Sequence, residues 1–130
     1  GHRMALSVAL LAPSDIPALA AFISTDLPPA RPEATLKGEA TRGKDYYTHL
    51  CSACHGGNAL GNPILGAPSL AGASDWYLKS AYQGVLDGLR GQHVDDVYGA
   101  QMARLAPALS DENDLDDVIA HIMTLPPKRS

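Results

Sequence analysis

The sequence predicts an all-α fold. Apolar residues recur at the i, i+3, i+4, i+7 spacing of an amphipathic helix in two stretches, residues 16–23 and 115–122. No stretch alternates polar and apolar residues as a half-buried strand would. Gly and Pro cluster between the periodic segments, where they end helices. Together these observations favour a small domain made of packed helices.

The first helix of the main domain is expected over residues 41–55. Tyr47 lies one helical turn before Cys51, and the run Gly56-Gly57-Asn58 stops the helix. Residues 56–73 are dense in Gly and Pro and are expected to form a loop.

A second helix is expected to follow this loop. Ser74 suits its N-cap, and Asp75 in the first turn is favourable for the helix dipole. The helix should run to about Leu86 or Asp87, where Gly88 ends it.

The last helix is expected between a cap at Ser110 and the stop at Pro126-Pro127. Its apolar stripe consists of Leu115, Val118, Ile119 and Ile122. Its acidic residues are expected to form a solvated face, with a benefit from the helix dipole: Asp111, Glu112, Asp114, Asp116 and Asp117.

The N-terminal stretch repeats this last helix. Ile16, Leu19, Ala20 and Ile23 form the same stripe displaced by 99 positions, and Leu27-Pro28-Pro29 matches Leu125-Pro126-Pro127. Met4 precedes Pro29 by 25 positions, as Met102 precedes Pro127. The repeat favours residues 1–29 as the closing piece of a preceding domain of the same type, in a longer protein. Chance similarity or a simple N-terminal extension is the alternative; Pro13, Ser14, Asp15 and Pro17 would interrupt the apolar core of a signal peptide.

The domain organisation follows from this repeat. Residues 30–40 continue a Pro-rich stretch and are interpreted as a linker. Residues 41–130 form the main domain.

Composition limits the function classes. The 130 residues carry 10 basic and 14 acidic side chains, and a net charge of −4 argues against a nucleic-acid surface. No run approaches the 18 or so apolar residues of a membrane span. With one Phe, one Trp and three Met, the chain is poor in large apolar side chains. A buried cofactor would supply the missing core, so the protein is expected to fold poorly without it.

The sequence Cys51-Ser52-Ala53-Cys54-His55 carries the most specific chemical signal. C-x-x-C-H is the attachment site of a c-type haem: two thiols form thioether bonds, and the histidine becomes the proximal iron ligand. A disulfide, half a zinc site or a thioredoxin-like pair are the alternatives. A closed zinc site needs four ligands, and the chain has only these two cysteines and no H-x(3–5)-H pair after them. A thioredoxin-like motif would need an α/β pattern. One haem c per chain is therefore expected.

The residues alone offer several candidates for the sixth iron ligand. An electron carrier keeps both axial positions filled, and a Met ligand raises the reduction potential. Met102 is the preferred candidate because it lies in a stretch of weak helix and strand signal, expected to be a loop folding over the far haem face. His93 is the main competitor. His121 and Met123 lie within the last helix, where packing or exposure is the simpler role.

Over residues 38–127 the chain resembles the class I c-type cytochromes, above all the domains of periplasmic bacterial di-haem cytochromes. The resemblance is carried by Gly43-x3-Tyr47-x3-Cys51-Ser-Ala-Cys54-His55-Gly56, Pro68-Ser-Leu70-Ala-Gly72, Trp76-Tyr77-Leu78, Gly88-Leu-Arg90, Met102 and Leu109-Ser110-Asp111. It implies a small all-α fold wrapped around one covalent haem, with crossing N- and C-terminal helices.

The resemblance also implies roles for single residues. Gly43 would be the crossing glycine, with Tyr47 packed near it, while His121 stands where the family commonly has Tyr. Pro68 would accept the Nδ1–H of the proximal histidine. The haem propionates would be bound by Trp76, Tyr77, Tyr82 and Arg90.

The function implied is one-electron transfer with His55 and Met102 as axial ligands, without a catalytic residue. The domain would be periplasmic, free or tethered to the membrane through other parts, and would serve a respiratory or dehydrogenase chain. Its partners would be redox proteins or neighbouring haem domains. An enzyme or gas sensor with an open or labile sixth position, using His93 or Arg90, is one alternative. A purely structural haem domain is another.

Overall fold

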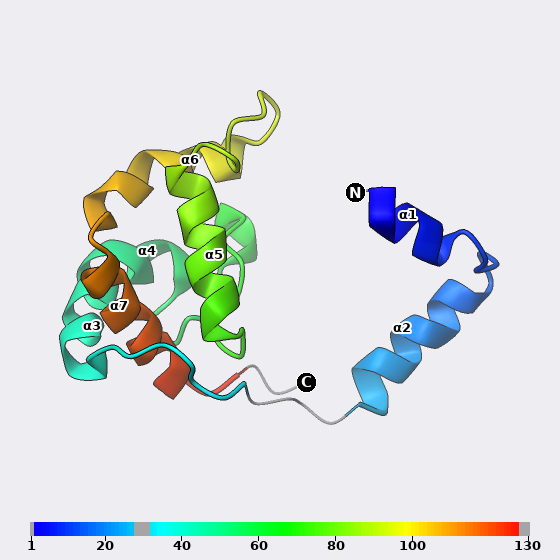
Figure 1. Ribbon diagram of the computed structural model, residues 1–130, viewed down its shortest axis with the longest axis horizontal. Helices are drawn as coiled ribbons and strands as arrows, with labels where there is room; N and C mark the ends of the chain where they lie inside the picture. The colour runs from blue at the N-terminus through cyan, green and yellow to red at the C-terminus, as the bar shows by residue number, and fades with distance from the viewer. Residues whose placement is uncertain (1, 28–31, 128–130) are drawn as a thin grey trace. The chain divides into compact units, whose positions relative to one another are not determined.

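The computed structural model describes residues 2–27 and 32–127, which divide into two compact units at Ala30 (Figure 1). The larger unit contains three helices longer than eight residues, α5 (Asp75–Leu86), α6 (Val97–Leu105) and α7 (Glu112–Thr124). Its shorter elements are α3 (Ala40–Tyr46), the π-helical turn η1 (Tyr47–Cys51), α4 (Ser52–His55), and the 3₁₀ turns η2 (Pro63–Leu65) and η3 (Ala106–Leu109). The described residues contain no strand, only an isolated bridge between Asn62 and Ala67, so the all-α fold is confirmed.

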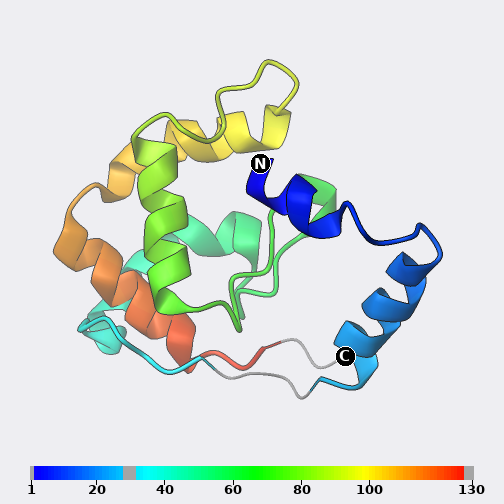
Figure 2. The same cartoon turned by 45° about the vertical axis from the view of Figure 1, so that its right-hand side comes forward.

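Helix α3, which continues through η1 into α4, packs against α7, and α7 also packs against α5. In both views α6 lies across one end of α5, and η3 leads the chain from α6 to α7 (Figures 1 and 2). A Cβ added at Gly43 would overlap the backbone carbonyl of Asp117, so only a glycine allows α3 to approach α7 this closely.

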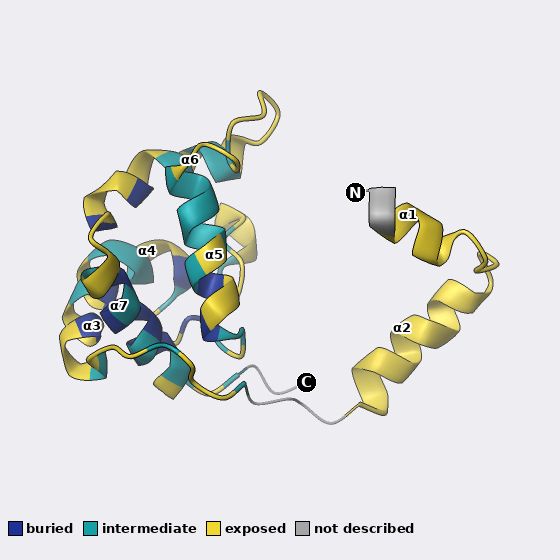
Figure 3. Ribbon diagram, in the orientation of Figure 1, coloured by how far each residue is buried: buried dark blue, intermediate teal, exposed yellow. Residues whose placement is uncertain are grey.

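The apolar stripe of α7 supplies four of the eight buried residues in the core cluster of the described chain, and α7 is largely coloured as buried in Figure 3. Its members Leu115, Val118, Ile119 and Ile122 are 2–4% exposed. Burying one such side chain contributes about 1.5–3 kcal/mol. Tyr47, 1% exposed, packs its ring against that of His121, with 5.3 Å between the ring centroids. His121 thus packs where the family resemblance leads one to expect a tyrosine.

Two buried carboxylates bind the segment that precedes α3. Asp75 of α5 accepts hydrogen bonds from the backbone N–H groups of Thr35 and Leu36, and Asp117 of α7 accepts from that of Glu39 and from Arg42. Part of the stretch interpreted as a linker is therefore fixed to the main domain. The expectation of a wholly solvated acidic face was wrong for Asp117, which is 3% exposed, because these donors compensate its burial.

The ends of α5 and α7 differ from expectation in their caps. α5 covers the predicted residues, but the side chain of Ser74 makes no capping hydrogen bond. Asp111 and not Ser110 caps α7, since its carboxylate accepts from the backbone N–H groups of Asn113 and Asp114. A carboxylate one residue closer to the helix fills the position that the serine was expected to take.

The smaller unit contains α1 (His2–Val8) and α2 (Asp15–Thr25). Every side chain described in it, from Met4 to Leu27, is exposed. None of the helices in the described residues is long and apolar enough to cross a membrane.

Candidate functional site

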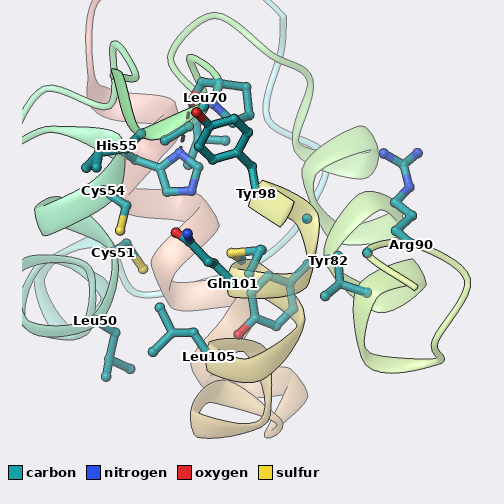
Figure 4. Close-up of a pocket in the computed structure, with 18 of the residues that line it drawn as sticks. Leu50, Cys51, Cys54, His55, Leu70, Tyr82, Arg90, Tyr98, Gln101 and Leu105 are labelled. Atoms are coloured by element: carbon teal, nitrogen blue, oxygen red, sulfur yellow. Dashed lines mark hydrogen bonds between the residues drawn. The ribbon is translucent and has the colours of Figure 1, made fainter. Parts of the chain in front are cut away.

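A cavity of about 330 Å³ lies among η1, α4, the loop around Pro68, α5 and α6. Figure 4 shows Cys51, Cys54 and His55 along one side of it. The other side is formed by α6, with Tyr98, Gln101 and Leu105 (Figure 4). Much of the lining is apolar, including Leu50, Leu65, Leu70, Val85, Leu105 and Leu109.

The two cysteines lie at the end of η1 and within α4. They are free thiols and form no disulfide with each other. Burial raises the pKa of Cys51 to about 11, so its thiol is protonated at neutral pH. The helical turn between the two residues places both side chains on the lining of the same cavity.

The imidazole of His55 is held by a hydrogen bond from one of its two ring nitrogens. Its Nδ1 lies 2.9 Å from the carbonyl oxygen of Pro68. Because a carbonyl can only accept, Nδ1 carries the proton and donates it. Nε2 therefore keeps its lone pair, and the ring reaches into the cavity (Figure 4). This is the arrangement by which a second hydrogen bond fixes a metal-binding histidine and makes it more basic.

Met102 lies on the opposite wall, but not in the expected loop. It belongs to α6, which begins where the carboxylate of Asp96 accepts a hydrogen bond of 2.8 Å from the backbone N–H of Gly99. Met102 is half-buried and lines the cavity together with Gln101. The expectation of a loop was wrong because this cap and the packing around the cavity stabilise a helix of weak intrinsic propensity.

The four residues expected at haem propionates separate into two pairs. Tyr82 and Arg90 line the cavity, and the hydroxyl of Tyr82 donates to the carbonyl of Ala106 at 2.7 Å. Trp76 and Tyr77 are not among its lining residues; they are 62% and 46% exposed and form an edge-to-face pair on α5. The structure therefore does not bring this second pair to the cavity.

The competing iron ligands lie elsewhere. His93 has an exposed side chain beside Asp95 and does not line the cavity. His121 packs in the core against Tyr47, and Met123 packs beside that core. Among the described methionine and histidine candidates other than His55, Met102 alone lines the cavity.

Sequence reasoning missed Tyr98 and Gln101. The ring of Tyr98 lies over Gly66, where a Cβ would overlap it, and so closes the cavity beside the Pro68 loop. Residues 98, 101, 102 and 105 share a helical i, i+3, i+4, i+7 spacing. Recognising that spacing would have placed them on one face with Met102.

The donor set suits a covalently bound haem. Two thiols and an imidazole nitrogen lie on one wall, a thioether lies on the other, and much of the remaining lining of the cavity is apolar. An all-α domain of this size with such a wall is a class I c-type cytochrome domain.

Comparison with known proteins agrees with this class. The sequence model of the cytochrome c family matches residues 40–126. The chain is 34% identical over 92 residues to cytochrome c-554(547) of Halothiobacillus neapolitanus, covering 68% of this chain and 98% of that protein. It is 29% identical over 100 residues to the thiosulfate dehydrogenase electron acceptor of Stutzerimonas stutzeri strain A1501, covering 71% of this chain and 43% of that protein. The chain thus spans less than half the length of the second relative.

The chain belongs to the cytochrome c family. Members of this family bind haem c covalently, so haem c with its iron is the cofactor of this domain. Haem-based electron transfer is the corresponding activity.

Proposed function

We propose that the domain carries single electrons on one haem c whose axial ligands are His55 and Met102. The observation that supports the proposal is that both side chains line one cavity, His55 from the end of α4 and Met102 from α6. The haem supplies a reversible ferric–ferrous couple. A thioether opposite an imidazole favours the ferrous state, so we expect a higher potential than with two histidines.

The other lining residues have supporting roles in this proposal. The carbonyl of Pro68 keeps the ring of His55 in one tautomer. Arg90 is the proposed propionate partner, since a guanidinium pairs well with a carboxylate. Burial raises the pKa of Tyr82 to about 12, so its hydroxyl keeps its proton and donates it to the carbonyl of Ala106, which leaves no proton for a propionate.

Absorbance spectra of the holo-protein test the ligation. We expect low-spin bands in both oxidation states and a weak far-red iron–thioether band in the ferric protein. Met102→Ala should remove that band, while Met123→Ala, a methionine outside the cavity, should keep it. A band that survives in Met102→Ala, or a change caused by His93→Ala, would overturn the assignment.

Carbon monoxide tests the alternative of an open or labile sixth position. The ferrous wild-type protein should bind the gas slowly and weakly because Met102 occupies the site. Fast, tight binding to the wild type would favour a haem enzyme or gas sensor instead.

The domain is proposed to serve a periplasmic respiratory or dehydrogenase chain, with redox proteins or neighbouring haem domains as partners. The names of the relatives, a cytochrome c and an electron acceptor of thiosulfate dehydrogenase, support this role. Cell fractionation should find the haem-loaded protein with periplasmic markers. Rapid reduction by thiosulfate with its dehydrogenase, and not by thiosulfate alone, would identify such an enzyme as a donor.

A further inference from the structure

The helices α1 and α2 repeat α6 and α7 in both sequence and structure. Met4-Ala5 in α1 corresponds to Met102-Ala103 in α6. The helices that follow, α2 and α7, end at Thr25 and Thr124, which are 99 positions apart. Two helices in the same order, with equivalent residues displaced by 98 positions for the methionines and 99 for the threonines, indicate one supersecondary unit used twice.

The two copies differ sharply in burial. On α7 the stripe is 2–4% exposed, whereas on α2 the equivalent residues Ile16, Leu19 and Ile23 are 59%, 42% and 62% exposed. No residue of α2 is buried. A row of exposed apolar side chains along one helix face marks an interaction surface.

The larger unit shows what covers such a face. There the stripe of α7 packs against α3 and η1, the segment that leads into the haem-attachment cysteines. Gly43 allows the close approach, and Tyr47 one turn later packs on His121. On α2 the residue at the His121 position is Phe22, which offers an aromatic ring to the same kind of partner.

Met4 extends the correspondence to the haem. It stands in α1 as Met102 stands in α6, and its side chain is 69% exposed. If His55 and Met102 share a haem, the equivalent helix pair offers Met4 to a haem carried by its own partner.

We propose that the apolar face of α2 binds the haem-bearing helix of a second cytochrome c domain, and that Met4 becomes the sixth ligand of that haem. This rests on the proposed function, because the role of Met4 is inferred from Met102. This chain matches only 43% of the length of the relative from Stutzerimonas stutzeri. The unmatched part of that relative is long enough for a second domain. The partner is defined by its chemistry: a helix with Gly and Tyr one turn apart, followed by C-x-x-C-H.

A haem peptide is the most direct probe. Residues 40–57 of this chain, with haem attached to Cys51 and Cys54, form a peptide whose iron has an open sixth position. We would titrate it into the full holo-protein and follow binding by calorimetry and the spin state of the peptide haem by difference spectroscopy. We expect saturable 1:1 binding and conversion of the peptide haem to a low-spin form.

Three variants of the full chain separate the contribution of the apolar face of α2 from that of Met4. Leu19→Glu with Ile23→Glu should weaken binding at least tenfold, whereas Ala21→Glu on the opposite face of α2 should not. Met4→Ala should retain most of the affinity but leave the peptide haem high-spin.

Other results would overturn the inference. They are an absence of saturable binding, binding unaffected by the double Glu variant, or a low-spin peptide haem with Met4→Ala. Dimerisation of the free chain that the double variant abolishes would identify a second copy as the occupant and also refute it. The spectrum of the chain's own haem before peptide is added tests the proposed function separately.

Discussion

The hydroxyl of Tyr47 donates a hydrogen bond to the carbonyl oxygen of Gly56, with 2.6 Å between the two oxygens. The bond spans the turn that contains Cys51, Cys54 and His55. Gly56 has a φ of +81°, a conformation that glycine adopts without strain. Burial raises the pKa of Tyr47 to about 12, so this donor is present at any pH the protein meets. The side chain of Tyr47, four residues before Cys51, therefore ties the two ends of the C-x-x-C-H segment together.

Removing this hydroxyl should destabilise the holo-protein. Tyr47→Phe keeps the ring on His121 but removes one of the two donors to the Gly56 carbonyl, leaving only the backbone N–H of Ala59. We expect the free energy of unfolding in urea to fall by about 1 kcal/mol. Tyr77→Phe, on an exposed ring, is the control and should change it by less than about 0.5 kcal/mol. Equal stabilities of Tyr47→Phe and wild type would show that the bond contributes nothing.

The crossing of α3 and α7 should not tolerate a methyl group. In Gly43→Ala the new Cβ would overlap the carbonyl of Asp117, so the helices must separate. We expect a loss of roughly 1–3 kcal/mol or more, measured by thermal or urea unfolding. Gly57→Ala is a matched control, because a Cβ there meets no atom within 4 Å. A comparable loss in both variants would contradict the crossing as the cause.

His121 should make the stability of the protein depend on pH. Burial, with a smaller contribution from Lys44, lowers its pKa below the ordinary value of about 6.5. As the pH falls below 6.5, the unfolded chain binds the proton first. Stability should therefore be complete above 6.5 and decline as the pH falls through the lower folded pKa.

The pH dependence can be assigned by substitution. His121→Phe keeps a ring against Tyr47 and should flatten the decline between pH 6.5 and 5. His93→Gln changes an exposed histidine and should leave it intact. Urea midpoints across this range would refute the role of His121 if both variants behaved as wild type does.

Asp75 and Asp117 should account for most of the loss of folding stability at acid pH. Burial opposes the charge of Asp75, but hydrogen bonds from Leu36, Thr35 and Trp76 outweigh it and lower its pKa. The backbone N–H of Glu39 is the main cause of the lowered pKa of Asp117. Stability from both groups is present above about pH 4 and is lost as the pH falls through their folded pKa values.

Amide variants test these carboxylates. Asp75→Asn or Asp117→Asn should cost roughly 1–3 kcal/mol at pH 7, because an amide cannot accept all the donors present. Each variant should also make the free energy of unfolding fall less steeply as the pH drops below about 4. The exposed Asp45→Asn should do neither, and an acid limb unchanged in all three variants would be inconsistent with the assigned roles.

Local signals in the sequence were sufficient for the fold class and for the positions of α5 and α7, but not for α6, which was expected to be a loop. Helix α5 follows its prediction closely, because Asp75 at its start and Gly88 after its end are strong local signals. The cap of α7 was misassigned because Ser110 and Asp111 are both good capping residues, and only their backbone conformations distinguish them.

The site was predictable where chemistry fixes the spacing and less so where packing decides. Cys51, Cys54 and His55 form a single motif, and the carbonyl of Pro68 lies where the family resemblance implied. Trp76 and Tyr77 do not line the cavity, because the face of α5 toward it carries Tyr82 and Val85; their propionate role stays a prediction. The direction in which Trp76 and Tyr77 point around α5 depends on Leu78 packing into the core. No local sequence pattern predicts that packing.

The most direct test of the account is a potentiometric titration of the wild-type holo-protein beside Met102→His. The account predicts a reversible one-electron couple with one haem per chain, and a clearly lower potential in Met102→His because imidazole replaces the thioether. Met123→His, outside the cavity, should leave the potential unchanged. A wild-type potential that Met102→His does not lower would contradict Met102 as the axial ligand, and with it the proposed electron-transfer site.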